Sequence, residues 1–128
     1  MKHNIDADEV YTEFSKKLSK CKGNADDVVS VTKEYSKKIL NMNYAPISFK
    51  FARCLTKLSV DKLMDPEEYY SIIRAHGSVV INSGDPECNY WFTALVKGSD
   101  IEKHGDVISK SGNEQYTSAF VKRIGSKK

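Results

Sequence analysis

Residues 65–77 read DPEEYYSIIRAHG, and residues 85–98 read DPECNYWFTALVKG. Both segments open with Asp-Pro-Glu, three residue types that suit the start of a helix. An Asp in front of a helix accepts hydrogen bonds from its first N–H groups, and Pro fits a first-turn position whose N–H has no helical acceptor. Glu in the first turn stabilises the positive end of the helix dipole. The two segments therefore predict two helices, and the remaining chain can be interpreted outward from them.

The apolar pattern of the second segment favours a helix over a strand. Its apolar residues recur at helical spacing and form one predicted face, Cys88, Trp91, Phe92, Leu95 and Val96. We expect Trp91 to pack in the core with this face, and Asn89, Tyr90 and Thr93 to lie largely on the other side. In the first segment, the equivalent face consists of Tyr69, Ile72, Ile73 and His76.

Three further helices are predicted in the N-terminal half. Asp6, followed three residues later by Glu9, can cap a helix that ends at Gly23. Asn24 can cap a second helix that continues to residue 42, and so short a connection predicts an antiparallel or steeply crossed pair. Pro46 suits the start of a third helix. A loop or short helix is expected from residue 59 to residue 64.

The C-terminal third allows two interpretations. The chain after Gly98 is rich in turn residues. Before it, between the two Asp-Pro-Glu segments, residues 78–82, SVVIN, have strand character but no obvious partner strand, so they suit either a strand or a buried connection. A last helix fits residues 113–124, with Tyr116, Phe120 and Ile124 on one face. The same residues also suit a strand paired with residues 106–110 in a small antiparallel sheet.

The predicted fold is mainly α, a single compact domain over residues 1–128 with five or six short helices. A small β element in the C-terminal third is the alternative, and residues 1–5 and 125–128 are expected to fray. The chain has the length of one ordinary domain, with 40% apolar and 29% charged residues, and no apolar run is long enough to span a membrane. With no signal-peptide core at the N-terminus, we expect a cytoplasmic protein.

No catalytic, metal or cofactor motif is recognisable. The histidines and cysteines are scattered along the chain, His3, His76, His104, Cys21, Cys54 and Cys88. None of them forms the close pairs that are typical of metal sites or redox motifs, and no glycine-rich phosphate loop occurs. Convergence of His76, Cys88 and His104 in the fold is the one alternative that the spacing leaves open. We expect neither an enzyme nor a bound metal or cofactor.

Basic residues make nucleic-acid binding one functional hypothesis. Lys50, Arg53 and Lys57 share a predicted helix face, and Lys122 and Arg123 lie near the C-terminus. If these side chains converged, they could neutralise several phosphates. The net charge of +3 is small, however, and no nucleic-acid recognition motif is present.

Aromatic residues in the acidic middle of the chain support the leading hypothesis, which is protein binding. Residues 65–106 carry a net charge of −5, whereas residues 1–64 and 107–128 each carry +4. Tyr70 and Tyr90 lie on the predicted polar sides of their helices. Because Tyr is enriched at interface hot spots, these two residues are the predicted protein-contact sites.

A small helical chain rich in lysine and asparagine, without catalytic motifs, is similar to the early accessory proteins of large T4-like bacteriophages. Residues 4–11, NIDADEVY, resemble the start of the type that binds host RNA polymerase. The resemblance implies a non-enzymatic protein that acts on the transcription machinery in the host cytoplasm. It carries over no site residue.

Overall fold

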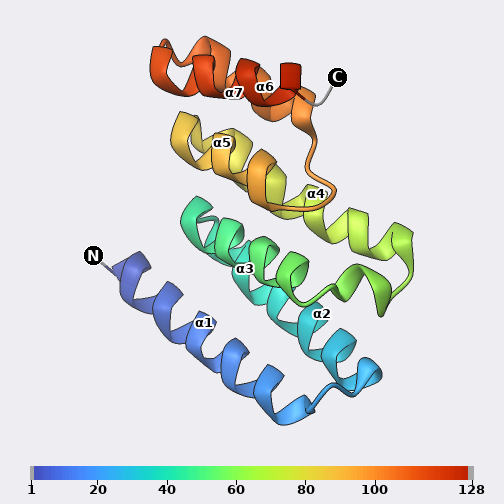
Figure 1. Ribbon diagram of the computed structural model, residues 1–128. Helices are drawn as coiled ribbons and strands as arrows, with labels where there is room; N and C mark the ends of the chain where they lie inside the picture. The colour runs from blue at the N-terminus through green and yellow to red at the C-terminus, as the bar shows by residue number, and fades with distance from the viewer. Residues whose placement is uncertain (1, 127–128) are drawn as a thin grey trace.

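Seven α-helices and one short 3-10 helix account for most of the computed structural model (Figure 1), which describes the backbone of residues 2–126 and the side chains of residues 7–124. Their bounds are α1 Lys2–Cys21, α2 Ala25–Met42, α3 Ala45–Lys57, η1 Val60–Lys62, α4 Pro66–Ser83, α5 Pro86–Leu95, α6 Ile101–Lys110 and α7 Glu114–Ser126. The mainly α prediction is confirmed, although the expected number of helices, five or six, is too low. No strand occurs in the described residues.

The helices pair into three stacked hairpins. The most extensive contacts join α1 to α2, α3 to α4, and α5 to α6. Within the stack, α1, α3, α5 and α7 contact one another in that order, and α2, α4 and α6 do the same, so the helices form two layers (Figure 1). Helical repeat proteins are built by stacking hairpins in this way, and they use the resulting extended surfaces for binding. The predicted pairing of α1 with α2 is confirmed.

Three helix starts, those of α2, α4 and α5, follow the predicted capping chemistry. Asn24 accepts a hydrogen bond from the backbone N–H of Asp27 at 3.0 Å. At the two Asp-Pro-Glu segments, Asp65 accepts from the N–H of Glu68 at 3.2 Å and Asp85 accepts from the N–H of Glu87 at 3.1 Å. These bonds satisfy N–H groups that have no acceptor within their own helices. Both segments therefore begin helices, α4 and α5, as predicted.

Aromatic side chains join the first two hairpins in one core. Phe14 of α1 lies with its ring centroid 4.9 Å from that of Phe51 in α3 and 5.6 Å from that of Tyr35 in α2. Phe51 in turn lies 4.7 Å from the ring of His76 in α4, and all four side chains are fully buried. Burial of such large rings stabilises the stack across the hairpin boundaries.

Several local predictions are wrong. Helix α1 begins at Lys2, so Asp6 lies inside the helix instead of in front of it. Residues 78–82 belong to α4, because a helix that packs on both α3 and α5 overrides the strand preference of three β-branched residues. Residues 101–110, expected to be turn-rich, form α6, which Asp100 caps through the N–H of Lys103 at 3.1 Å.

The ends of the chain give a mixed outcome. The last segment is a helix, α7, and the alternative of a strand paired with residues 106–110 is wrong. Residues 2–5 and 125–126, which were expected to fray, belong to α1 and α7. Residue 1 and residues 127–128 lie outside the described part of the chain. Among the described helices, none has both the length and the apolar character needed to cross a membrane.

Candidate functional site

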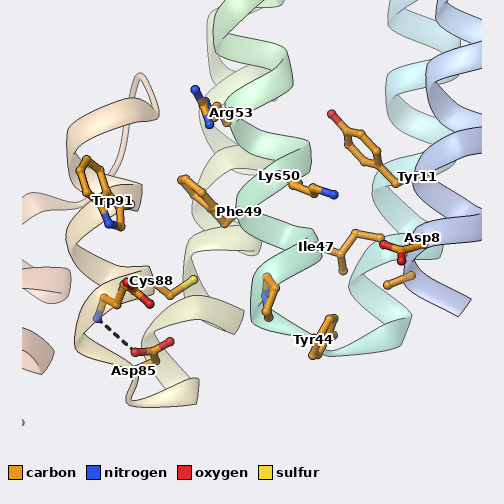
Figure 2. A pocket seen from close by; sticks show the side chains of 13 residues that line it. Asp8, Tyr11, Tyr44, Ile47, Phe49, Lys50, Arg53, Asp85, Cys88 and Trp91 are labelled. Atoms are coloured by element: carbon orange, nitrogen blue, oxygen red, sulfur yellow. Dashed lines mark hydrogen bonds between the residues drawn. The ribbon is translucent and has the colours of Figure 1, made fainter. Parts of the chain in front are cut away.

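A groove of about 540 Å³ lies between α1, α3 and α5, on the layer formed by the odd-numbered helices (Figure 2). We call it the α1–α3–α5 groove. Its lining consists of Ala7, Asp8 and Tyr11 from α1, Tyr44, Pro46, Ile47, Phe49, Lys50 and Arg53 at and within α3, and Asp85, Glu87, Cys88 and Trp91 at and within α5. Each hairpin of the stack thus contributes its first helix to the groove.

Trp91 is the most unusual residue of the groove, because this large side chain, the only tryptophan of the chain, is 40% exposed. The prediction that it packs in the core is wrong. Phe92, the next residue, is fully buried and stacks on His104 with ring centroids 4.7 Å apart. Since neighbouring helix residues point about 100° apart, burial of Phe92 turns Trp91 outward into the groove.

The buried face of α5 is rotated relative to the predicted face because its polar residues find partners inside the protein. Asn89 is fully buried and donates to the carbonyl oxygens of Val80 at 3.0 Å and Asp85 at 2.8 Å. Its side-chain oxygen lies 2.6 Å from Nδ1 of His104. With its hydrogen-bonding groups satisfied, Asn89 can take a core position that apolar periodicity would assign to other residues.

The aromatic side chains of the groove come from different helices. Phe49 projects from α3 toward the α5 wall that carries Trp91, and Tyr11 projects from α1 on the other side (Figure 2). Phe49 is half-buried, with its ring centroid 6.4 Å from that of Phe92. The centre of the groove is therefore apolar and aromatic, with Phe49 and Trp91 accessible from solvent.

The basic side chains of the groove belong to α3. Lys50 and Arg53 are one helical turn apart and both line the groove. The ammonium group of Lys50 lies 5.1 Å from the centroid of the Tyr11 ring, a cation–π contact across to α1. Neither cation takes part in an ion pair with the side chains that the structure describes.

Negative charge comes from the start of α5 and from α1. Asp85 lies at the opposite end of the groove from Arg53, and Asp8 lies on the α1 wall (Figure 2). Glu87 also lines the groove, in the first turn of α5 that follows Asp85. Glu87 accepts a hydrogen bond from the Tyr116 hydroxyl at 2.8 Å, which anchors its carboxylate beside α7. Arg53 and Asp85 thus lie at opposite ends of the groove, and Lys50 and Asp8 lie between them on the α3 and α1 walls.

Tyr11, Cys54 and Cys88, which lie in or beside the groove, are in their neutral forms at pH 7. Burial raises the pKa of Tyr11 to about 12, and burial together with Asp85 and Glu87 raises the pKa of the Cys88 thiol to about 12. Burial also raises the pKa of the Cys54 thiol, which lies beside Tyr11. A thiol protonated at neutral pH is a poor nucleophile, so these groups contribute contact surface to the groove.

The predicted site residues divide between the groove and other surfaces. Lys50 and Arg53 line it, whereas Lys57 is exposed at the end of α3 and Lys122 is exposed on α7. Arg123 is half-buried, hydrogen-bonds to Thr93 and lies 5.4 Å from the Tyr90 ring centroid. The structure therefore brings together two of the five predicted basic residues in this groove and gives Arg123 contacts between α5 and α7.

The predicted protein-contact residues lie outside the groove. Tyr70 is 41% exposed and packs edge-to-face on Tyr69. Tyr90 is half-buried, with its ring centroid 5.5 Å from that of Tyr116. Their neighbours differ, because Tyr70 lies beside Gly98 in the loop after α5 and Tyr90 faces α7.

His76 and His104 do not converge with Cys88. His76 is held by Ser36 and Ser48, and His104 is held by Asn89, all in buried positions. The described residues contain no group of three or more side chains placed to hold a metal ion. No protein-family model, curated protein or solved structure matches the chain.

Proposed function

We propose that the chain is a non-enzymatic binding protein and that the α1–α3–α5 groove holds a segment of a protein partner. The observation that carries the proposal is Trp91, 40% exposed on the α5 wall of a groove into which Phe49 projects from α3 and which charged side chains also line. Trp and Arg dominate interface hot spots, and an aromatic centre surrounded by polar residues is typical of such sites.

The hairpin stack supports this proposal because it holds the groove walls in place without a ligand. The wall helices α1, α3 and α5 come from three hairpins, and Phe51 of α3 packs into the buried core behind the groove. Walls that are fixed before binding lose little conformational entropy when a partner docks. The groove is therefore already formed in the structure without a partner.

The resemblance of the N-terminal segment to phage accessory proteins makes host RNA polymerase the first partner to test. A pull-down from bacterial lysate should recover polymerase subunits with the wild-type chain and lose them with Trp91→Ala. Recovery of polymerase by both proteins would place its contact outside the groove, with Tyr70 and Tyr90 as the next residues to replace.

A selection from a display library of random peptides tests the groove without a presumed partner. We expect enriched peptides that compete with one another, lose at least about tenfold in affinity for Trp91→Ala, and bind Val121→Ala normally. Val121 is the matched control, because it is an exposed apolar residue, 61% accessible, on α7 outside the groove. Failure to enrich peptides, or equal binding to both variants, would contradict the proposal.

Nucleic-acid binding is the second candidate, favoured by Lys50 and Arg53 beside aromatic rings on which bases could stack. The carboxylates of Asp8, Asp85 and Glu87 in the same groove would repel phosphates, so we rank it below protein binding. A gel-shift titration at low and high salt separates the two. Salt-sensitive binding that Lys50→Ala and Arg53→Ala weaken would favour nucleic acid.

A further inference from the structure

We infer that the occupant of the α1–α3–α5 groove is an amphipathic helix with an acidic residue at one end of its apolar face and a basic residue at the other. This inference rests on the proposed function and specifies the chemistry of the partner segment. It follows from the secondary structure of the groove walls and from the placement of their charges.

The walls exclude an extended segment that pairs through its backbone. All three are α-helices, and the N–H and C=O groups inside a helix already bond to each other. A bound strand would find no sheet edge to extend and would leave its own backbone groups without protein partners. A helix satisfies its backbone internally and can bind through side chains alone, so a helix suits this groove.

The exposed rings in the groove are best covered by an apolar face of that helix. Phe49 and Trp91 are the accessible rings, Cys88 lies on α5 between Trp91 and Asp85, and Ile47 lies on the side of α3 that faces α1 (Figure 2). A helix presents neighbouring apolar side chains at positions i, i+3 or i+4, and i+7. Such a face would cover both rings and remove Trp91 from water.

The charges of the groove determine which end of the bound apolar face carries the basic residue and which end carries the acidic residue. Helix α5 extends from Asp85 and Glu87 toward Trp91, while α3 brings Arg53 to the end where Trp91 lies (Figure 2). From Asp85 to Trp91 the α5 axis covers about 9 Å, the rise of about six residues in the partner helix. A basic residue of the partner therefore faces Asp85 and Glu87, and an acidic residue at the other end of the apolar face faces Arg53.

These groove charges are available to a partner. The ion pairs among the described side chains do not include Arg53, Asp8, Asp85 or Glu87, although one Glu87 oxygen accepts a hydrogen bond from the Tyr116 hydroxyl. Arg53 is half-buried, and Asp8 and Asp85 are exposed. Charges in such rim positions contribute more to specificity and to the association rate than to affinity, so they select the charge pattern of the segment while the apolar centre supplies most of the binding free energy.

Charge reversal in the library selection tests the inference. The proteins compared are the wild type, Arg53→Glu, Glu87→Lys and Lys103→Glu. Lys103 is the matched control, because it is an exposed lysine on α6, outside the groove. Arg53→Gln, which removes the charge without reversing it, serves as the second variant if Arg53→Glu does not fold.

Wild-type selections should enrich helix-forming peptides with an apolar face between an acidic and a basic residue. Peptides selected on Arg53→Glu should carry a basic residue where the wild-type peptides carry the acidic one. Peptides selected on Glu87→Lys should carry an acidic residue where the wild-type peptides carry the basic one. Wild-type peptides should lose at least about fivefold in affinity for either variant and keep their affinity for Lys103→Glu.

The outcomes separate this inference from the proposed function. Peptides that lose affinity for Trp91→Ala but bind Arg53→Glu and Glu87→Lys as tightly as the wild type would overturn the inference. They would still support the groove as a protein-binding site. Peptides with an extended, Pro-containing consensus would also overturn it. If the selection enriches no peptide and single-stranded DNA binds instead, both the inference and the proposed function are wrong.

Discussion

His76 and His104 are buried side chains held by neutral hydrogen-bond partners. Nε2 of His76 lies 2.9 Å from the Ser36 hydroxyl, and its Nδ1 lies 3.1 Å from the Ser48 hydroxyl. Burial lowers the pKa of His76 to about 4 and is also the main cause that lowers the pKa of His104 to about 4. Both rings are therefore neutral at pH 7, and each joins two or more helices in the core.

Stability should fall as the pH is lowered from about 6.5 toward about 4, because the unfolded histidines bind protons in this window and the folded ones do not. Each histidine should cost about 2 kcal/mol of the free energy of unfolding between pH 7.5 and pH 5. Urea unfolding at the two pH values measures the difference. The difference between the two pH values should be smaller for His76→Gln. A free energy of unfolding that does not change with pH would contradict the conclusion that both histidines are buried and neutral.

At the level of helices, a helix can be predicted from the sequence when a capping residue directly in front of it marks its start. Helices α4 and α5 were predictable, because Asp65 and Asp85 cap them through residues two or three positions away. Helix α6 was missed, because Gly105 in its middle resembles a turn signal and only tertiary structure explains it. A Cβ at Gly105 would lie 2.7 Å from the ring of Phe120 in α7, so glycine permits the two helices to approach.

Gly105→Ala should destabilise the protein by about 1–3 kcal/mol, because the new methyl group clashes with the Phe120 ring and outweighs the gain in helix propensity. Chemical denaturation measures the change. Ser109→Ala is the control, an exposed position of the same helix, and it should be neutral or slightly stabilising. Stabilisation by both substitutions would contradict close packing of α6 on α7.

Asp100→Ala should lower the free energy of unfolding by about 1 kcal/mol, because it removes the cap that accepts from the Lys103 N–H. Asp100→Asn keeps a capping oxygen but loses the ion pair with Arg74, a contact of 3.4 Å that is largely exposed on the Arg74 side. The Asn variant should therefore stay within about 0.5 kcal/mol of the wild type in the same denaturation assay. Equal losses in the two variants would show that the ion pair, and not the cap, stabilises the start of α6.

For the whole molecule, the stack of hairpins creates a surface that no single segment encodes. The groove takes Tyr11, Lys50 and Trp91 from three helices that are about 40 residues apart in the chain. The sequence identified Lys50 and Arg53 as a polar helix face, and that much was predictable from helical spacing. It could not show that α5 turns Trp91 outward, because the rotation depends on Asn89 meeting His104 of another helix.

The most direct test of the account is the solvent accessibility of Trp91 while the groove is occupied. As the only tryptophan, Trp91 reports on the groove without labelling. A peptide from the selection, free of tryptophan and added at saturation, should shift its emission to shorter wavelength and reduce its quenching by acrylamide. Unchanged emission and quenching with the peptide bound would contradict the assignment of the α1–α3–α5 groove as the docking site.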